Sequence, residues 1–92
     1  MIKNVELSKQ AKKDLKKVPS YIVEKLFEWI DSVEEEGLEE TRMIIGFHDE
    51  SLKGKRRGQR SIRLSKHYRA IYKIKNYEIE FCEVQEVNKH DY

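Results

Sequence analysis

Residues 53–75 constrain the fold of this chain most, because they combine a purely basic charge with two strand-like runs. The segment holds ten Lys or Arg and no Asp or Glu. Within it, residues 61–64 (SIRL) and 68–72 (YRAIY) have the apolar and aromatic content that is typical of strands. The residues between the two runs are few enough for a hairpin loop. The segment therefore predicts an antiparallel hairpin inside a basic region.

Two arginines face each other in such a hairpin. Side chains alternate along a strand, so Ile62 and Leu64 share one face and Arg63 points to the other. If the three intervening residues form the loop, Leu64 faces Tyr68 and Arg63 faces Arg69. Like charges that face each other on a ladder are destabilising, so the pair suggests a binding site for an anion. A solvated basic face is the alternative, and the spacing alone does not decide between the two.

The charged residues are segregated along the chain, although the net charge is only +2. Residues 1–23 hold six basic and two acidic side chains, residues 24–50 hold two and ten, and residues 76–92 hold one and five. Together with the basic segment 53–75, this separation indicates a surface for a polyanion. The lysines within residues 9–17 either extend this basic surface or form a solvated helix face.

The length of the chain permits one modest core, so we expect a single domain over residues 1–92. Its only cysteine, Cys82, excludes an intrachain disulfide and lies in an apolar run, where we expect a small core residue. The three histidines are too scattered to predict a zinc site, and we expect neither a metal nor a cofactor. Without a signal peptide or a long apolar span, the chain is expected to be soluble and cytoplasmic, with no membrane contact.

The expected order of elements is β-α-α-β-β-β, an α+β fold. The predicted strands and helices, in chain order, are strand 2–7, helices 9–17 and 19–36, and strands 61–64, 68–72 and 77–87. Ser8 is a plausible N-cap, Pro19 separates the helices, and Gly37 ends the second helix. The two N-terminal helices should pack on one face of a small, largely antiparallel sheet. The other face should carry Arg63 and Arg69.

The last strand changes phase within its length. Ile79 and Phe81 share one phase of the alternation, whereas Val84 falls in the other. A bulge near Cys82 and Glu83 would bring all three apolar side chains to one face. The intervening segments are expected to be a loop or a further helical turn at 38–45, a loop at 46–58 and a hairpin turn at 75–76.

This order of elements and four short segments resemble the RelE/ParE superfamily of bacterial type II toxins. The segments are 52–54 (LKG), 61–64 (SIRL), 68–72 (YRAIY) and 89–92 (KHDY). The resemblance covers nearly the whole chain and is greatest to the RelE, HigB and YoeB-like mRNA interferases, which depend on the ribosome. ParE-type gyrase poisons are similar in fold but lack the catalytic residues.

The resemblance implies a set of catalytic residues. In the YoeB-like branch an acidic residue precedes a Pro-Leu-Lys step, and residues 50–53 (ESLK) match it with Ser in place of Pro. Arg63 and Arg69 match basic positions of that branch. The branch ends in a His-Tyr pair, whereas this chain ends in 90–92 (HDY), with Asp91 inserted. The implied catalytic set is Glu50, Arg63, Arg69, His90 and Tyr92.

Metal-independent RNA cleavage needs a base for the ribose 2′-hydroxyl, cations for the phosphorane and an acid for the leaving 5′-oxygen. Glu50 is a candidate base, and His90 is a candidate base or acid because imidazole titrates near neutrality. Arg63 and Arg69 suit charge stabilisation, and Tyr92 suits base stacking or proton transfer. The residues expected to hold the RNA backbone are Lys53, Lys55, Arg56, Arg57 and Arg60.

Three functions remain open at this point. The first is a type II toxin that cleaves mRNA in the ribosomal A site by 2′-hydroxyl attack on the phosphodiester. Its implied partners are a cognate antitoxin, the ribosome and mRNA, without a small-molecule cofactor. The second is a ParE-like inhibitor of DNA gyrase. The third is a catalytically weak relative that only binds its antitoxin.

Overall fold

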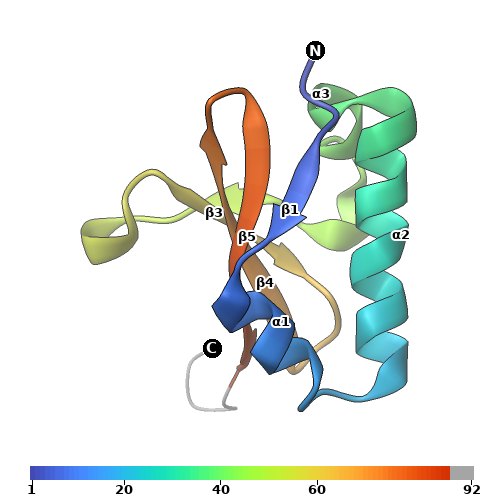
Figure 1. Ribbon diagram of the computed structural model, residues 1–92, viewed down its shortest axis with the longest axis vertical. Helices are drawn as coiled ribbons and strands as arrows, with labels where there is room; N and C mark the ends of the chain where they lie inside the picture. Colours follow the sequence, from blue (N-terminus) through green and yellow to red (C-terminus); the bar gives the residue numbers. More distant parts are fainter. Residues whose placement is uncertain (88–92) are drawn as a thin grey trace.

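The structure is a computed structural model, which describes residues 1–87 (Figure 1). Its five strands form one sheet in the order β1-β5-β4-β3-β2. β1 (Val5–Leu7) runs parallel to β5 (Glu78–Glu86), whereas the other neighbouring strands pair antiparallel. The remaining strands are β4 (Tyr68–Lys75), β3 (Gln59–Arg63) and the short edge strand β2 (Glu50–Ser51). The predicted α+β class and the largely antiparallel sheet are confirmed.

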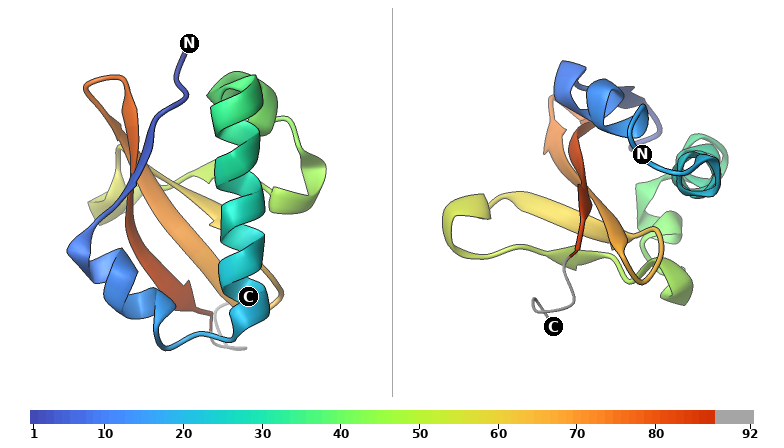
Figure 2. Two further views of the ribbon diagram at one scale, coloured as in Figure 1. Left: turned by 45° about the vertical axis from the view of Figure 1, so that its right-hand side comes forward. Right: turned by 90° about the horizontal axis from the view of Figure 1, so that it is seen from below.

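Two helices pack against one face of this sheet (Figure 2). α1 (Lys9–Leu15) begins after Ser8, whose Oγ accepts a hydrogen bond from the backbone N–H of Ala11 at 3.0 Å. This confirms the predicted N-cap. α2 (Ser20–Glu36) ends at Gly37, where a φ of 90° places the backbone in the region that favours glycine.

An aromatic cluster joins α2 to the centre of the sheet. Trp29 of α2, Tyr72 of β4 and Phe81 of β5 are all fully buried. Their ring centroids lie 5.1 to 5.6 Å apart in tilted and edge-on arrangements, which aromatic pairs prefer. The core therefore lies between α2 and strands β4 and β5, and no α-helix within residues 1–87 covers the opposite face of the sheet.

The β3–β4 hairpin has the predicted register. Arg63 is paired directly with Arg69, and the backbone N–H of Leu64 donates to the carbonyl of Tyr68 at 2.9 Å. Ile62 and Ala70, one position further along, are buried in the core. Because neighbouring side chains alternate, both arginines project from the face without a helix, which we call the open face.

A bulge in β5 corrects the phase of that strand, as predicted. Ile71 of β4 pairs with Glu83, whereas Tyr72 pairs with Phe81, so Cys82 is the extra residue. Val84 thereby reaches the core. The prediction that Cys82 itself is a core residue is wrong, because the bulge takes it out of the alternation and leaves it only partly buried. Burial still raises the pKa of its thiol.

The segment between α2 and β3 is more ordered than the sequence indicates. It forms α3 (Leu38–Thr41), the 3-10 turns η1 (Ile45–Phe47) and η2 (Gly54–Arg56), and the edge strand β2. The predicted helical turn after Gly37 is confirmed. The loop predicted for 46–58 is wrong where β2 pairs Glu50 with Ser61, because a two-residue strand is too short to show periodicity.

Several element boundaries differ from the sequence prediction by one to three residues. β1 begins at Val5 and α1 ends at Leu15, so both elements are shorter than predicted. The β4–β5 turn lies at Asn76 and Tyr77, which have φ values of 52° and 64°. No helix within residues 1–87 has the length and apolar character needed to span a membrane.

Candidate active site

A hollow of about 180 Å³ lies on the open face, where β2, β3, β4 and the end of β5 meet. Arg63 and Ser61 reach it from β3, Arg69 from β4, and Glu50 from β2. The full set of lining residues is His48, Glu50, Ser61, Arg63, Ser65, Lys66, Tyr68, Arg69 and Val87. It combines cations, a carboxylate, an imidazole and hydroxyl groups in one place.

The structure brings together three of the five catalytic residues that the resemblance implies: Glu50, Arg63 and Arg69. His90 and Tyr92 lie outside the described residues. Val87, the last residue described, lines the hollow, and its backbone N–H donates to the carbonyl of His67 at 2.6 Å.

Arg69 is held in position by Gln85, its cross-strand neighbour on the same face of the sheet. Its Nε donates a hydrogen bond to Oε1 of Gln85 at 3.2 Å, and Nε2 of Gln85 donates to Oε2 of Glu83 at 2.9 Å. Glu83 is in turn ion-paired with Arg56. A guanidinium carries five N–H donors, so the bond to Gln85 uses only one of them. This series of contacts could not be predicted from the sequence, because its members come from β4, β5 and η2.

His48 is a residue of the hollow that sequence reasoning missed. Its Nε2 lies 3.6 Å from Oε2 of Glu50, and the two side chains are 60% and 55% exposed. His48 has a φ of 45°, a left-handed conformation at the end of η1. The sequence does place His48 two positions before Glu50, a spacing that brings two side chains to one face in an extended segment, although His48 itself is not extended. Glu50 therefore has an imidazole as its neighbour, and this pair contains the described groups best suited to proton transfer.

The side chain of Asp49 points away from the hollow and is 1% exposed. Its Oδ1 accepts a hydrogen bond from Nε of Arg60 at 2.6 Å, and its Oδ2 accepts one from the Tyr72 hydroxyl at 2.5 Å. Burial and the bond to Asp49 raise the pKa of Tyr72 well above its ordinary value. Arg60 pairs with Tyr72 in the β3–β4 ladder, on the face that carries the core. Its guanidinium is thus engaged on the side of the sheet opposite to Arg63.

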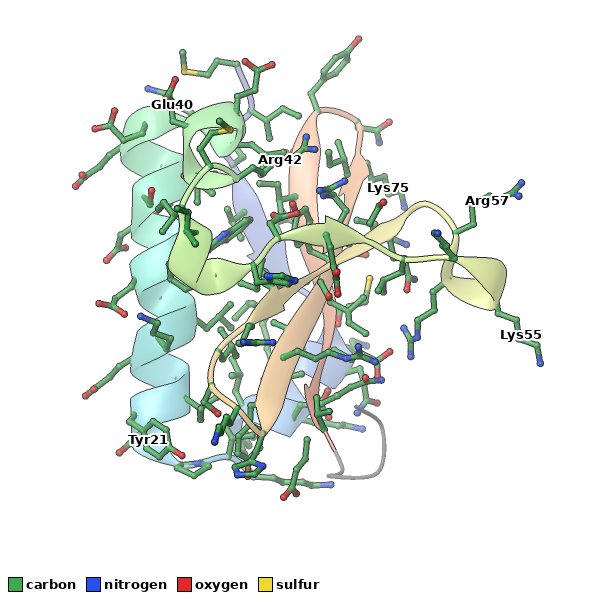
Figure 3. The ribbon with its side chains drawn as sticks, turned by 180° about the vertical axis from the view of Figure 1, so that it is seen from behind. Tyr21, Glu40, Arg42, Lys55, Arg57 and Lys75 are labelled. Carbon is green, nitrogen blue, oxygen red and sulfur yellow. The ribbon has the colours of Figure 1, made fainter. Side chains whose placement is uncertain are left out.

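The basic loop, residues 53–57, projects from the sheet with Lys55 and Arg57 at its far end (Figure 3). Lys53, Lys55 and Arg57 are exposed. Arg56 instead turns back to the sheet, where it contacts Glu83 and donates from Nη1 to Oε1 of Gln59 at 3.0 Å. On the opposite side of the molecule, α2 presents an acidic surface that includes the exposed residues Glu24, Glu28, Asp31, Glu34, Glu35 and Glu36.

The described side chains do not form a metal centre. Within residues 1–87, no group of three or more His, Cys, Asp or Glu is arranged to hold an ion. The hollow instead offers the two guanidinium groups of Arg63 and Arg69, which suit a phosphate group because they stay charged and bind it bidentately.

Solved toxin structures share this fold at low sequence identity. YafQ from E. coli strain BL21(DE3) matches with a TM-score of 0.74 and 20% identity, over 91% of this chain and 92% of that chain. The YoeB-YefM complex from Staphylococcus aureus gives 0.70 and 24%, over 92% and 97%. The toxin-antitoxin complex RelBE2 from Mycobacterium tuberculosis gives 0.68 and 19%, over 94% and 99%. Comparison with curated proteins gives no match.

The fold of this chain is that of these solved toxin structures. The sequence itself matches the model of a family described as the ParE toxin of the type II toxin-antitoxin system, parDE, over residues 5–90. The chain therefore belongs to the ParE toxin family, and it is the toxin of a type II toxin-antitoxin system. The superfamily predicted from the sequence is confirmed.

Proposed function

We propose that this toxin is a metal-independent endoribonuclease that cleaves mRNA in the ribosomal A site and so inhibits translation. The observation that carries the proposal is the convergence of Glu50, Arg63 and Arg69 on one hollow. These are the described members of the set that the resemblance to the YoeB-like branch implies. The ribosome and mRNA are thus the proposed targets, and the cytoplasm is the proposed place of action.

In the proposed reaction, Arg63 and Arg69 hold the scissile phosphate between them. The like charges of the cross-strand pair are then neutralised by the substrate, and they stabilise the additional negative charge of the phosphorane. Glu50 takes the proton of the 2′-hydroxyl, the 2′-oxygen bonds to phosphorus, and the bond to the 5′-oxygen breaks. The leaving oxygen receives a proton, and we assign the donation of this proton to His90. We assign to Tyr92 either stacking on a nucleobase of the RNA or assistance in the proton transfer.

The basic loop is the part of the protein proposed to bind the RNA backbone. Lys53, Lys55 and Arg57 are exposed and suit this role. Arg56 joins them only if it leaves Glu83, to which it is ion-paired. Arg60 has its guanidinium bonded to a buried carboxylate, so we leave it out of the RNA contacts.

The proposed protein partner is a cognate antitoxin with an acidic segment. The YoeB-YefM structure and the DinJ-YafQ structure of E. coli are toxin-antitoxin complexes by their descriptions. In this chain, the cations of the open face and of the basic loop offer complementary charge to an acidic partner. Such complementarity speeds association most at low salt.

A second candidate function is inhibition of DNA gyrase. The observation that favours it is the family model, which is that of the ParE toxin. By the resemblance described above, ParE-type gyrase poisons have this fold without the catalytic set. The placement of Glu50, Arg63 and Arg69 around one hollow is the reason for ranking RNA cleavage first. A weak relative that only binds its antitoxin is the third candidate.

One experiment separates the three candidates. The toxin is expressed from an inducible promoter, the 5′ ends of cellular mRNAs are mapped, and plasmid supercoiling is assayed in parallel. Arg69→Ala serves as the inactive variant. We expect new mRNA ends within codons of translated regions that depend on Arg69, with unchanged supercoiling. A change in supercoiling without new ends would favour the gyrase inhibitor, and neither effect would favour the weak relative.

A further inference from the structure

Along the chain, a residue with a buried carboxylate lies between two residues that line the hollow. The side chain of Asp49 is 1% exposed, whereas its chain neighbours His48 and Glu50 both line the hollow on the open face. Asp49 faces the other side of the sheet, toward Arg60 and Tyr72. One short segment therefore carries a buried attachment point on one side and two groups for proton transfer on the other.

The attachment is strong because both carboxylate oxygens are used. Oδ1 accepts from Arg60 at 2.6 Å and Oδ2 accepts from the Tyr72 hydroxyl at 2.5 Å. Hydrogen bonds to an ionised carboxylate are about twice as strong as neutral ones. Tyr72 itself packs against the rings of Trp29 and Phe81. The bonds of Asp49 thus tie the segment to the buried aromatic cluster of the core.

The segment is also attached by the ladder of β2, by the hydrogen bond from the Leu52 N–H to the Gln59 carbonyl at 2.9 Å, and by the buried side chain of Phe47. β2 is only two residues long and pairs only with β3, at the edge of the sheet. Glu50 is about half exposed, and its distance to His48 is 3.6 Å. An exposed pair of this kind contributes little to holding a loop in place. Within residues 48–51, the side chain of Asp49 is therefore the buried contact that acts together with the β2 ladder to fix where Glu50 lies relative to the arginines.

We propose that Asp49 is a positioning residue, whose bonds to Arg60 and Tyr72 hold Glu50 and His48 in place at the hollow. It touches no substrate itself. The inference deepens the proposed function and rests on it in one respect, because it takes Glu50 to act in cleavage. It also gives Arg60 a role other than RNA binding, which the basic character of residues 53–75 could not reveal.

Tyr72→Phe is the primary test variant. It removes one of the two hydrogen bonds to Asp49 and keeps the ring that packs against Trp29 and Phe81. Tyr77→Phe is the matched control, because it is the same chemical change at a side chain that is 86% exposed in the β4–β5 turn. Arg60→Gln is the second variant and separates the anchoring role from RNA contact.

The kinetic readout is mRNA cleavage on programmed ribosomes, with kcat and KM measured separately. We expect Tyr72→Phe to lower kcat about tenfold with KM within about twofold, because a small misplacement of a catalytic group mainly reduces the rate. Arg60→Gln should act in the same way. A direct RNA contact of Arg60 would instead raise KM and reduce the salt slope of binding by roughly 0.7. Wild-type kcat in Tyr72→Phe would overturn the proposal.

The second readout does not depend on activity. Amide hydrogen exchange of the full-length protein should become faster in residues 47–52 of Tyr72→Phe and remain unchanged in β4 and β5. Unchanged exchange in 47–52, or faster exchange throughout the sheet, would overturn the anchoring role. If the wild-type protein cleaves no mRNA, the proposed function fails, and the exchange measurement alone still decides whether Asp49 holds the segment.

Discussion

Arg69 and Gln85 face each other across β4 and β5, and the Arg69 Nε donates to the Gln85 Oε1 at 3.2 Å. The contact fixes the direction of a guanidinium that also stands opposite Arg63. Without an acceptor on its Nε side, Arg69 would be expected to turn away from the like charge of Arg63. Gln85 therefore influences the position of Arg69 in the hollow, although Gln85 is not one of the lining residues.

The first prediction follows from this contact. Gln85→Leu removes the acceptor and leaves a side chain of similar size on the open face. We expect mRNA cleavage to fall about tenfold, ~1.4 kcal/mol of barrier, while the free energy of unfolding changes by less than about 1 kcal/mol. Gln10→Leu, at an exposed position of α1, is the matched control. Cleavage at the wild-type rate by Gln85→Leu would show that Arg69 needs no such support.

The second prediction concerns the arginine pair. Arg69→Ala should abolish growth arrest, because it removes charge stabilisation from the transition state, and Arg63→Ala should act in the same direction with a smaller effect. Neither change should lower the unfolding midpoint, since each relieves a like-charge pair worth roughly 0.2–1 kcal/mol. Arg42→Ala, at the C-cap of α3 and away from the hollow, is the control (Figure 3). A folded Arg69→Ala protein that still arrests growth would exclude the proposed role.

The third prediction concerns the basic loop. If Lys53, Lys55 and Arg57 contact phosphates, each replacement by Ala should weaken RNA binding equally at all codons. Each lost contact should also reduce the slope of log K against log salt by roughly 0.7. Lys75→Ala, an exposed cation at the far end of β4, controls for the general loss of charge. A triple variant with the wild-type slope would contradict the assignment.

The fourth prediction concerns stability. The Ser8 Oγ accepts from the Ala11 N–H at 3.0 Å and donates to the Cys82 carbonyl at 2.9 Å, so it joins the start of α1 to the bulge of β5. Ser8→Ala should lower the free energy of unfolding by about 1–2 kcal/mol in urea titrations. Ser20→Ala, at the exposed start of α2, should change it by less than about 0.5 kcal/mol. Equal effects of the two changes would contradict the double role of Ser8.

The fifth prediction concerns the residues after Val87. A segment of five residues reaches at most ~18 Å, which is enough to bring His90 to the hollow that Val87 lines. Deleting Asp91 and Tyr92 should leave the unfolding midpoint and antitoxin binding unchanged and reduce mRNA cleavage at least about tenfold. His90→Gln should act in the same direction, and Asp91→Asn should have a smaller effect. Equal cleavage by the truncated and full-length chains would return catalysis to Glu50 and the arginines.

The parts of the fold that local patterns determine were predictable from the sequence. The alternation of 61–64 and 68–72, with a short loop between them, was enough to place Arg63 opposite Arg69. The change of phase between Phe81 and Val84 was enough to locate the bulge. In both cases the pattern and its consequence lie within a few residues of each other, so strand geometry alone supplies the answer.

The parts that depend on contacts between distant residues were not predictable. Asp49 bonds to residues 11 and 23 positions away in the sequence, and no local pattern distinguishes its carboxylate from that of Glu50. Arg60 was grouped with the RNA-binding residues because its neighbours are basic, yet its partner is Asp49. The same holds for Arg56 and Glu83. Charge composition identifies a basic segment, but only the fold shows which of its cations already have partners.

The separation of α2 from the basic loop has a further consequence. The exposed acids of α2 and the exposed cations Lys55 and Arg57 lie on opposite sides of the molecule (Figure 3), so a protein of net charge +2 carries a large electric dipole. In the field of a polyanion, such a dipole experiences a torque before any contact is made. The molecule then arrives with its basic loop leading and its acidic helix trailing, so fewer of its encounters begin with the wrong side.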